Sequence, residues 1–280
     1  MYHEALFRRP VLTQEQDILV RQAKEGDAAA LAGLLKLVQH SVFRLSVRML
    51  GDPDKAQDAT QEILIRVITK LSTFNGGSRF ETWVHKVALN YLMTARKVIA
   101  RDPGLSFESF GKDLIDGLVD ESMASPEDHA MLNDLRLRCT MAMLMCLDRK
   151  HRAAYVLGEV LEMEHVEAAA ILEIEPAAFR KQLSRARASI QAFANTHCGL
   201  ANASAPCSCP KRLPAALNCG RLGSGPSPVL ADAPGYTAVK AMAARLNVRL
   251  VTVKLQQATG PLRAPEDLAA KVLSLVDPPT

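Results

Sequence analysis

Residues 14–195 are built mainly from Ala, Leu, Met, Gln, Glu, Lys and Arg, the residues that form helices most readily. Apolar side chains recur there at spacings of three and four residues, which places them on one face of each helix. Aromatic residues make up only 5% of the chain, so its cores must be aliphatic and rich in Met and Ala. The sequence therefore predicts an all-α fold.

Composition and missing motifs exclude several classes of protein. With 48% hydrophobic and 23% charged residues, the chain is neither wholly disordered nor collagen-like. No apolar run approaches the roughly 18 residues of a membrane span, and Arg8, Arg9 and Pro10 interrupt any signal peptide. We therefore expect a cytoplasmic protein that does not contact a membrane. Phosphate-binding loops, HExxH and nucleophile motifs are missing, so an enzyme is not expected.

Charge and turn residues divide the chain into segments. Residues 101–130 carry two basic and eight acidic side chains, a net charge of −6, among Gly and Pro residues. Residues 196–230 contain five Pro, four Gly and four Cys and show no helical period. The predicted organisation is two small helical domains at 14–100 and 129–195, an acidic linker with little core of its own at 101–128, a cysteine-rich segment at 196–230 and a C-terminal helical extension at 231–280.

Local signals set the helix boundaries of the first domain. Gly51-Asp52-Pro53 combines a helix terminator, an N-cap and a first-turn proline, so one helix ends there and the next begins. Ser78 and Glu81 have the spacing of a capping box, which predicts a helix from that point to about Lys97.

The second domain has helix-turn-helix spacing. A short helix at 165–172 is followed by a tight turn at 173–175 and a helix that Pro176 opens. Phe179, Leu183 and Ala186 recur on its inner face. The other face suits phosphates and base edges, although it is equally consistent with a solvated basic surface; it carries Arg180, Lys181, Ser184, Arg185 and Arg187.

Two further features lie in the first domain. Asp58, Gln61, Glu62 and Ile65 share one helix face, which suits a basic partner helix or is simply solvated. Four aromatic residues gather around an Asn-Gly-Gly loop and resemble a platform for single-stranded bases: Phe74, Phe80, Trp83 and Tyr91. The alternative is that Phe80 and Trp83 are core residues, which is our interpretation of Trp83.

Taken together, these segments resemble an extracytoplasmic-function (ECF) sigma factor of RNA polymerase. Residues 15–100 resemble region 2 of that family, through Asp58-Ala59-Thr60-Gln61-Glu62, Phe74-Asn75-Gly76-Gly77-Ser78-Arg79-Phe80-Glu81-Thr82-Trp83-Val84 and Asn90. Residues 130–195 resemble region 4, ending in Leu183-Ser184-Arg185-Ala186-Arg187. The likeness spans about 180 residues in the family's order.

The resemblance implies roles for individual residues. Asp58, Gln61 and Glu62, with Ile65, match the motif that meets the clamp helices of the polymerase largest subunit. The loop Asn75, Gly76, Gly77, Ser78 and Arg79, with Asn90, matches the elements that capture a flipped base of the -10 element. The recognition positions Arg180, Lys181, Ser184 and Arg185, with Arg187, match those that read the -35 element. Implied partners are core RNA polymerase and promoter DNA; whether a separate anti-sigma protein also exists is left open.

The sequence departs from the family pattern in three places. Glu173 replaces the usual glycine of the helix-turn-helix turn, where a left-handed backbone would be strained. Ala177-Ala178-Phe179 replaces Gly-Thr-Val, and His165 stands where an aromatic residue is common. These changes affect the expected -35 preference more than the fold.

The cysteine-rich segment predicts a metal site. Cys198, Cys207, Cys209 and Cys219 fall within 22 residues, and soft thiolates suit zinc, copper(I) or an iron–sulfur cluster. Some ECF sigma factors that resemble this chain carry C-terminal cysteine-rich extensions that sense metal. A reversible thiol switch and an inert tail are the alternatives. We expect His197 to be a bystander, and Cys139 and Cys146 to be plain core residues.

These observations leave three hypotheses of function. The leading one is a sigma factor controlled by metal or redox state through its tail, with a helix at about 236–258 covering or releasing the -35 face. The alternative is a metal-sensing helix-turn-helix regulator that does not bind polymerase. A metal chaperone or metal-dependent enzyme is the third. The face formed by Asp58, Gln61 and Glu62 favours the sigma factor, because a simple regulator would not need it.

Overall fold

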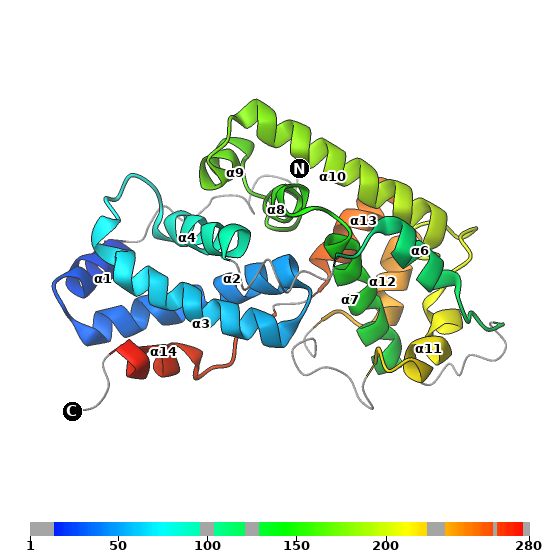
Figure 1. The fold of residues 1–280 in the computed structure, drawn as a ribbon, viewed down its shortest axis with the longest axis horizontal. Coiled ribbons are helices and arrows are strands. Elements are labelled where there is room, and N and C mark those ends of the chain that lie inside the picture. Colours follow the sequence, from blue (N-terminus) through cyan, green and yellow to red (C-terminus); the bar gives the residue numbers. More distant parts are fainter. Residues whose placement is uncertain (1–13, 96–103, 121–128, 223–232, 260–261, 277–280) are drawn as a thin grey trace, which may run out of the picture.

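The computed structural model describes residues 14–95, 104–120, 129–222, 233–259 and 262–276. Across these residues the chain is helical and forms no β-strand beyond an isolated bridge between Cys198 and Cys207. Two helical groups stand side by side, and the C-terminal helices lie against both (Figure 1). Within the described residues, no helix combines the length and the apolar character that crossing a membrane requires.

The first group consists of α1 (Gln14–Lys24), α2 (Ala28–Leu50), α3 (Pro53–Lys70), a 3-10 turn (Leu71–Thr73) and α4 (Phe80–Thr94). The predicted boundary between α2 and α3 is confirmed. Gly51 ends α2 in the left-handed conformation, with φ 70°. The Asp52 carboxylate then caps α3 by accepting from the backbone N–H groups of Asp54 and Lys55.

The predicted capping box at α4 is wrong. The N-cap of α4 is Arg79, which makes no side-chain cap bond, and Ser78 Oγ donates to the Arg79 carbonyl instead. The Glu81 carboxylate is used elsewhere, because it accepts a hydrogen bond of 2.9 Å from Gln16 Nε2 on α1.

The acidic linker is more ordered than its composition indicates. It contains α6 (Phe107–Ile115), whose Ser106 and Ser109 form a capping box. Phe110 and Leu114 of α6 are buried, and the Phe110 ring stacks on Phe193 with 5.2 Å between centroids. The prediction of a tether with little core is therefore wrong for 104–115; residues 101–103 and 121–128 lie outside the described part of the chain.

The second group consists of α7 (His129–Met145), α8 (Arg149–Tyr155), a π-helical turn (Val156–Val160), α9 (His165–Leu172) and α10 (Pro176–His197). One continuous apolar core joins this group to the first. At the junction, the buried Arg152 guanidinium donates to the Met49 carbonyl at the end of α2, at 2.7 Å.

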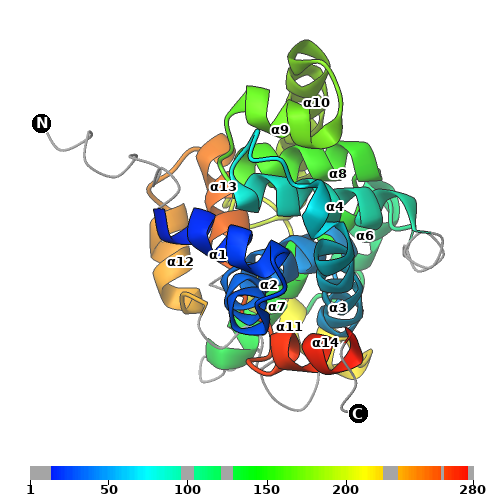
Figure 2. The ribbon, with the colours of Figure 1, turned by 90° about the vertical axis from the view of Figure 1, so that its left-hand side faces the viewer.

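The C-terminal extension forms α11 (Cys209–Asn218), α12 (Tyr236–Ala243), α13 (Val248–Gln257) and α14 (Leu268–Val276). The stretch expected as one helix at 236–258 is two, since Asn247 starts α13 by capping the Leu250 N–H. The cysteine-rich segment, which shows no helical period in its sequence, nevertheless contains the helix α11. This helix packs on α7 and buries Leu213 and Ala216 in a small core. Finally, α14 returns to the first group and packs against α2 and α3 (Figures 1 and 2).

Candidate functional site

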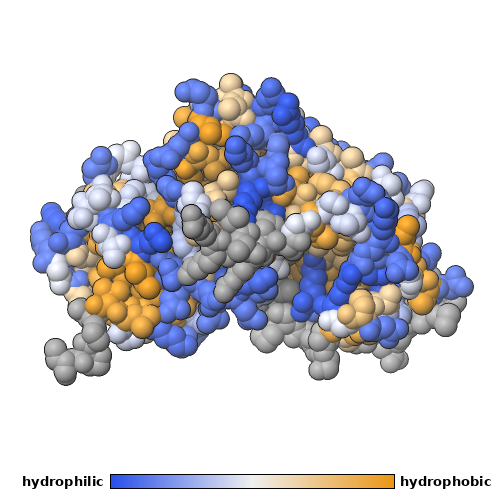
Figure 3. Space-filling model, in the orientation of Figure 1, coloured by the Kyte–Doolittle hydropathy of each residue, from blue (hydrophilic) through white to orange (hydrophobic). Residues whose placement is uncertain are grey.

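The basic helix α10 has the amphipathic placement that its sequence predicts. Phe179, Leu183 and Ala186 are buried, with at most 2% of their surface exposed. Hydrophilic side chains line the outer side of its N-terminal half (Figure 3). The exposed residues on this side are Arg180, Lys181, Ser184 and Arg185. Arg187 differs, because it is half-buried and its Nε donates to Glu159 Oε1 at 3.0 Å.

The turn before α10 contains the strain that the sequence predicts. Glu173 adopts the left-handed conformation, with φ 55° and ψ 41°. Its carboxylate forms an ion pair of 2.9 Å with Lys86 of α4. The ring of His165, at the start of α9, packs against Phe179 with 5.6 Å between centroids. The departures from the family pattern are thus accommodated without loss of the helix-turn-helix.

We expect Glu173→Gly to be more stable than Glu173→Ala by about 0.5–1 kcal/mol. Both variants lose the carboxylate that reaches Lys86, but only glycine relieves the left-handed backbone. Urea unfolding of the two full-length variants measures the difference. Equal stabilities would show that the turn carries no strain.

The loop before α4 is exposed at its tip but joined to the second group at its end. Asn75, Gly76, Gly77 and Ser78 are exposed, as is Asn90 on α4. Arg79 instead forms an ion pair of 2.5 Å with Glu167 of α9. The same carboxylate accepts a hydrogen bond from the Thr82 hydroxyl at 2.6 Å. The predicted base-binding loop therefore touches the helix-turn-helix.

The aromatic residues near this loop are mostly core. Phe74 and Phe80 are buried and pack edge to face, with 5.6 Å between centroids. Trp83 stacks on Phe80 at 5.8 Å and is half-buried, and Tyr91 is buried. The interpretation of the set as a platform for bases is therefore wrong for Phe74, Phe80 and Tyr91.

The predicted polymerase face lies on α3. Asp58 is exposed, and Gln61, Glu62 and Ile65 are partly buried. The helix that bears them has α14 packed against it. The predicted face and the C-terminal extension thus meet on one element.

Three of the four predicted metal ligands lie together with a cysteine that was expected to be plain core. Cys198 ends α10, Cys207 precedes α11 and Cys209 begins it. Cys139 of α7 packs against the same small apolar cores as these three residues. Cys219 stands apart, exposed at the end of α11. His197 stacks on Phe193 at 4.6 Å.

The thiols influence one another electrostatically. Burial raises the pKa of Cys139 to about 12, with Cys207 and Cys198 acting in the same direction. Burial, followed by Cys198, Cys139 and Cys207, raises the pKa of Cys209 well above its ordinary value. Within the described residues, no three His, Cys, Asp or Glu side chains stand close enough to hold a metal ion in the present arrangement.

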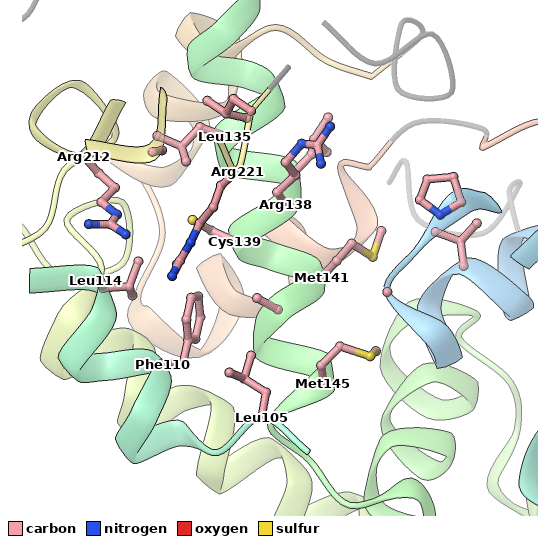
Figure 4. Close-up of a pocket in the computed structure, with 17 residues that line it drawn as sticks. Leu105, Phe110, Leu114, Leu135, Arg138, Cys139, Met141, Met145, Arg212 and Arg221 are labelled. Carbon is pink, nitrogen blue, oxygen red and sulfur yellow. The ribbon is translucent and has the colours of Figure 1, made fainter. Parts of the chain in front are cut away.

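A cavity of about 300 Å³ adjoins this cluster. Its lining is mostly apolar and comes from the α2–α3 corner, α6, α7 and α11, as Figure 4 shows for several of these side chains. Cys139 is one of the lining residues, with Arg212 and Arg221 nearby (Figure 4). Both arginines form ion pairs with Asp113 of α6. The cavity leaves free space beside Cys139.

Comparison with known proteins agrees with the geometry of both groups. Residues 34–98 match the family described as Sigma-70 region 2, and residues 137–190 match Sigma-70, region 4. The RNA polymerase sigma-H factor of Pseudomonas aeruginosa is 30% identical over 186 residues, which cover 64% of this chain and 94% of the relative. The chain belongs to the ECF sigma factors of RNA polymerase.

Other members of the family show comparable similarity. The ECF sigma factor SigW of Bacillus subtilis is 26% identical, covering 61% of this chain and 92% of its own. The ECF sigma-E factor of Escherichia coli is 27% identical, with 62% and 91% covered. The solved structure of CnrH in complex with the cytosolic domain of CnrY gives a TM-score of 0.44 at 20% identity, covering 65% of this sigma factor and 97% of that chain.

Family membership defines the general role of the protein. Sigma factors supply promoter recognition to RNA polymerase and are not enzymes, so core RNA polymerase and promoter DNA are partners of this sigma factor. Neither family match extends beyond residue 190. The cysteine cluster and helices α11–α14 therefore need an explanation of their own.

Proposed function

We propose that this sigma factor is held in a closed form by its own C-terminal extension, and that a metal ion or the redox state of its cysteines controls release. In the open form, Asp58, Gln61, Glu62 and Ile65 bind core polymerase. The loop Asn75–Arg79 and Asn90 act on the -10 element, while the exposed face of α10 reads the -35 element. The placement of these side chains on α3, on α4 with the loop before it, and on α10 supports this division of work.

The distance between the -35 and -10 elements on DNA supports the proposal that the closed form of the protein has to open. At 3.4 Å per base pair, positions -35 and -10 lie roughly 85 Å apart on straight B-DNA. In the closed form Arg79 contacts Glu167 of α9, and α9 packs directly on α10. The 22 residues of α10 extend only about 33 Å. The two reading surfaces therefore have to separate before both elements are read at once.

The packing of α14 supports a closing role for the extension, and it is the observation on which the proposal rests. Leu268, Ala269 and Val272 are at most 1% exposed against the first group. The Gln39 side chain accepts from the Ala269 N–H at 3.1 Å, and Arg48 Nη2 donates to Thr259 Oγ1 at 2.8 Å. Buried side chains that are also hydrogen-bonded make a specific interface.

Occupation of α3 gives the closed form its inhibitory effect. The extension packs on the same helix that carries the polymerase-binding residues. Of these residues, Gln61, Glu62 and Ile65 are partly buried. In addition, α13 packs against α10, and Gln257 Nε2 donates to the Glu159 carbonyl. The extension thus fastens the two groups to each other and takes the place of a separate anti-sigma protein.

The cysteine cluster is well placed to control this extension. The cluster lies at the junction where α10 ends and α11 begins. A structural change in the cluster would therefore alter the docking of helices α11–α14. Arg180, Lys181, Ser184 and Arg185 of α10 are exposed although α13 packs on this helix, which argues against the expectation that the tail covers the -35 face. Control instead operates through docking of the extension.

A charge placed in the α14 interface tests the proposal. Ala269→Glu puts a carboxylate into an apolar contact and should undock α14, whereas Ser274→Glu adds the same charge at an exposed position of the same helix. When core polymerase is titrated in transcription reactions, we expect the apparent dissociation constant of Ala269→Glu for core to be at least about tenfold lower than that of wild type. A tenfold change is equivalent to about 1.4 kcal/mol.

Two outcomes would contradict the proposal. In the first, α14 of Ala269→Glu is accessible to protease, but the affinity of this variant for core polymerase equals that of wild type and of Ser274→Glu. The other is failure of every variant to bind core polymerase, which would favour the helix-turn-helix regulator.

A further inference from the structure

Four cysteines from three elements converge where α7 meets the start of the extension. The Gly199 N–H donates to the Cys207 carbonyl at 2.7 Å, which ties the end of α10 to the segment before α11. Cys139 and Cys198 pack against the small core that contains Cys207. Cys139 and Cys209 pack together against the neighbouring core. The fold therefore packs Cys139 against the same two small cores as Cys198, Cys207 and Cys209.

Positive charge surrounds these thiols inside the protein. Arg136, on α7 just before Cys139, is 2% exposed, and its Nη1 has no hydrogen-bond partner. Arg212, which is 4% exposed, lies on α11 three residues after Cys209 and forms an ion pair with Asp113. A buried guanidinium with an unused donor needs a negative partner nearby.

Four thiolates around one divalent ion would supply that partner. Four charges of −1 and one of +2 leave a net charge of −2, and the buried Arg136 offsets one unit of it. Arg212 lies nearby but is already paired with Asp113. The positive end of α11 also favours thiolates at its first residue, Cys209. A tetrahedral set of four sulfurs is typical of zinc or an iron–sulfur cluster.

Helix geometry excludes Cys219 from this set. Cys209 and Cys219 stand at opposite ends of α11. Ten residues of α-helix separate their Cα atoms by about 15 Å. Two sulfurs on one zinc ion, each about 2.3 Å from the metal, must lie far closer than that. Cys219 is also exposed, outside the cluster.

We propose that Cys139, Cys198, Cys207 and Cys209 form a tetrathiolate zinc site that fastens the start of the extension to α7. Binding requires the four sulfurs to move to bonding distance, because no three of them stand that close in the present arrangement. This inference deepens the proposed control of the sigma factor, and its regulatory meaning rests on that proposal.

Metal binding by the full-length chain tests the ligand set. Protein purified under reducing, oxygen-free conditions is stripped with a chelator and titrated with Zn²⁺, or with Co²⁺ as a coloured probe. We expect one ion per chain and the thiolate-to-cobalt absorption of a four-sulfur tetrahedral site. Cys219→Ser should bind as wild type does. Cys139→Ser should lose more affinity than the 10–100-fold typical of outer-shell changes, roughly 100-fold or more.

Cys146→Ser is the matched control for folding, since Cys146 lies seven residues beyond Cys139 just after α7 and packs on the same small core. It should retain full metal affinity. Loss of binding in Cys219→Ser with retention in Cys139→Ser would overturn the ligand set, as would absence of binding in the wild type. Normal metal binding, with no effect of Ala269→Glu on core affinity, would contradict only the proposed control.

Discussion

Arg152→Met is expected to destabilise the chain by about 3–5 kcal/mol. Arg152 is 2% exposed, and its guanidinium satisfies backbone carbonyls from both helical groups. The acceptors are Met49 O at 2.7 Å, Leu144 O at 3.0 Å, Met145 O at 3.0 Å and Leu147 O at 2.9 Å. Methionine fills similar space but removes the donors to these carbonyls, although the Leu144 carbonyl keeps its bond from the Leu147 N–H at 3.1 Å.

Urea unfolding followed by far-UV circular dichroism measures this loss. Lys150→Met is the matched control, because Lys150 lies on the same helix and is exposed. It should change stability by less than about 0.5 kcal/mol. A loss below about 1 kcal/mol in Arg152→Met would show that the junction between the two groups does not depend on this residue.

The double substitution of Arg180 and Arg185 by alanine is expected to weaken binding to the -35 element by about 2–6 kcal/mol, or 1–3 kcal/mol for each side chain that reads a base edge. Both residues are exposed on the outer face of α10. Fluorescence anisotropy with specific and scrambled duplexes at several salt concentrations separates base reading from phosphate contact.

Arg187→Ala is the control within the same helix. Its guanidinium is already held by Glu159, so the substitution should affect local packing more than DNA affinity. Equal losses on specific and scrambled DNA in the double variant would contradict base reading. A larger loss in Arg187→Ala than in the double variant would contradict the assignment of the recognition face.

Local features of this fold could be predicted from the sequence. The boundary at Gly51 and Asp52, the inward face of α10 and the left-handed turn at Glu173 each depend on neighbouring residues alone. Backbone preferences and helical periodicity are enough to determine such features.

Features that depend on distant partners could not be predicted. Glu81 caps no helix because Gln16, 65 residues away, takes its carboxylate. The periodicity of α7 shows that Cys139 is inside, but nothing local indicates that the tail cysteines lie across from it. Likewise, the apolar face of α14 is evident from its sequence, whereas its docking on α2 and α3 requires the structure.

The distance between the two helical groups tests the closed form most directly. Fluorophores at the exposed positions Thr69 and Ser189, introduced through non-native amino acids, leave the cysteines unmodified. Energy transfer should be efficient in the free chain and should fall when core polymerase and promoter DNA separate the reading surfaces towards roughly 85 Å. Ala269→Glu should lower transfer in the free chain, and Ser274→Glu should not. Unchanged transfer in Ala269→Glu, or equal transfer in the free chain and the promoter complex, would contradict closure by the C-terminal extension.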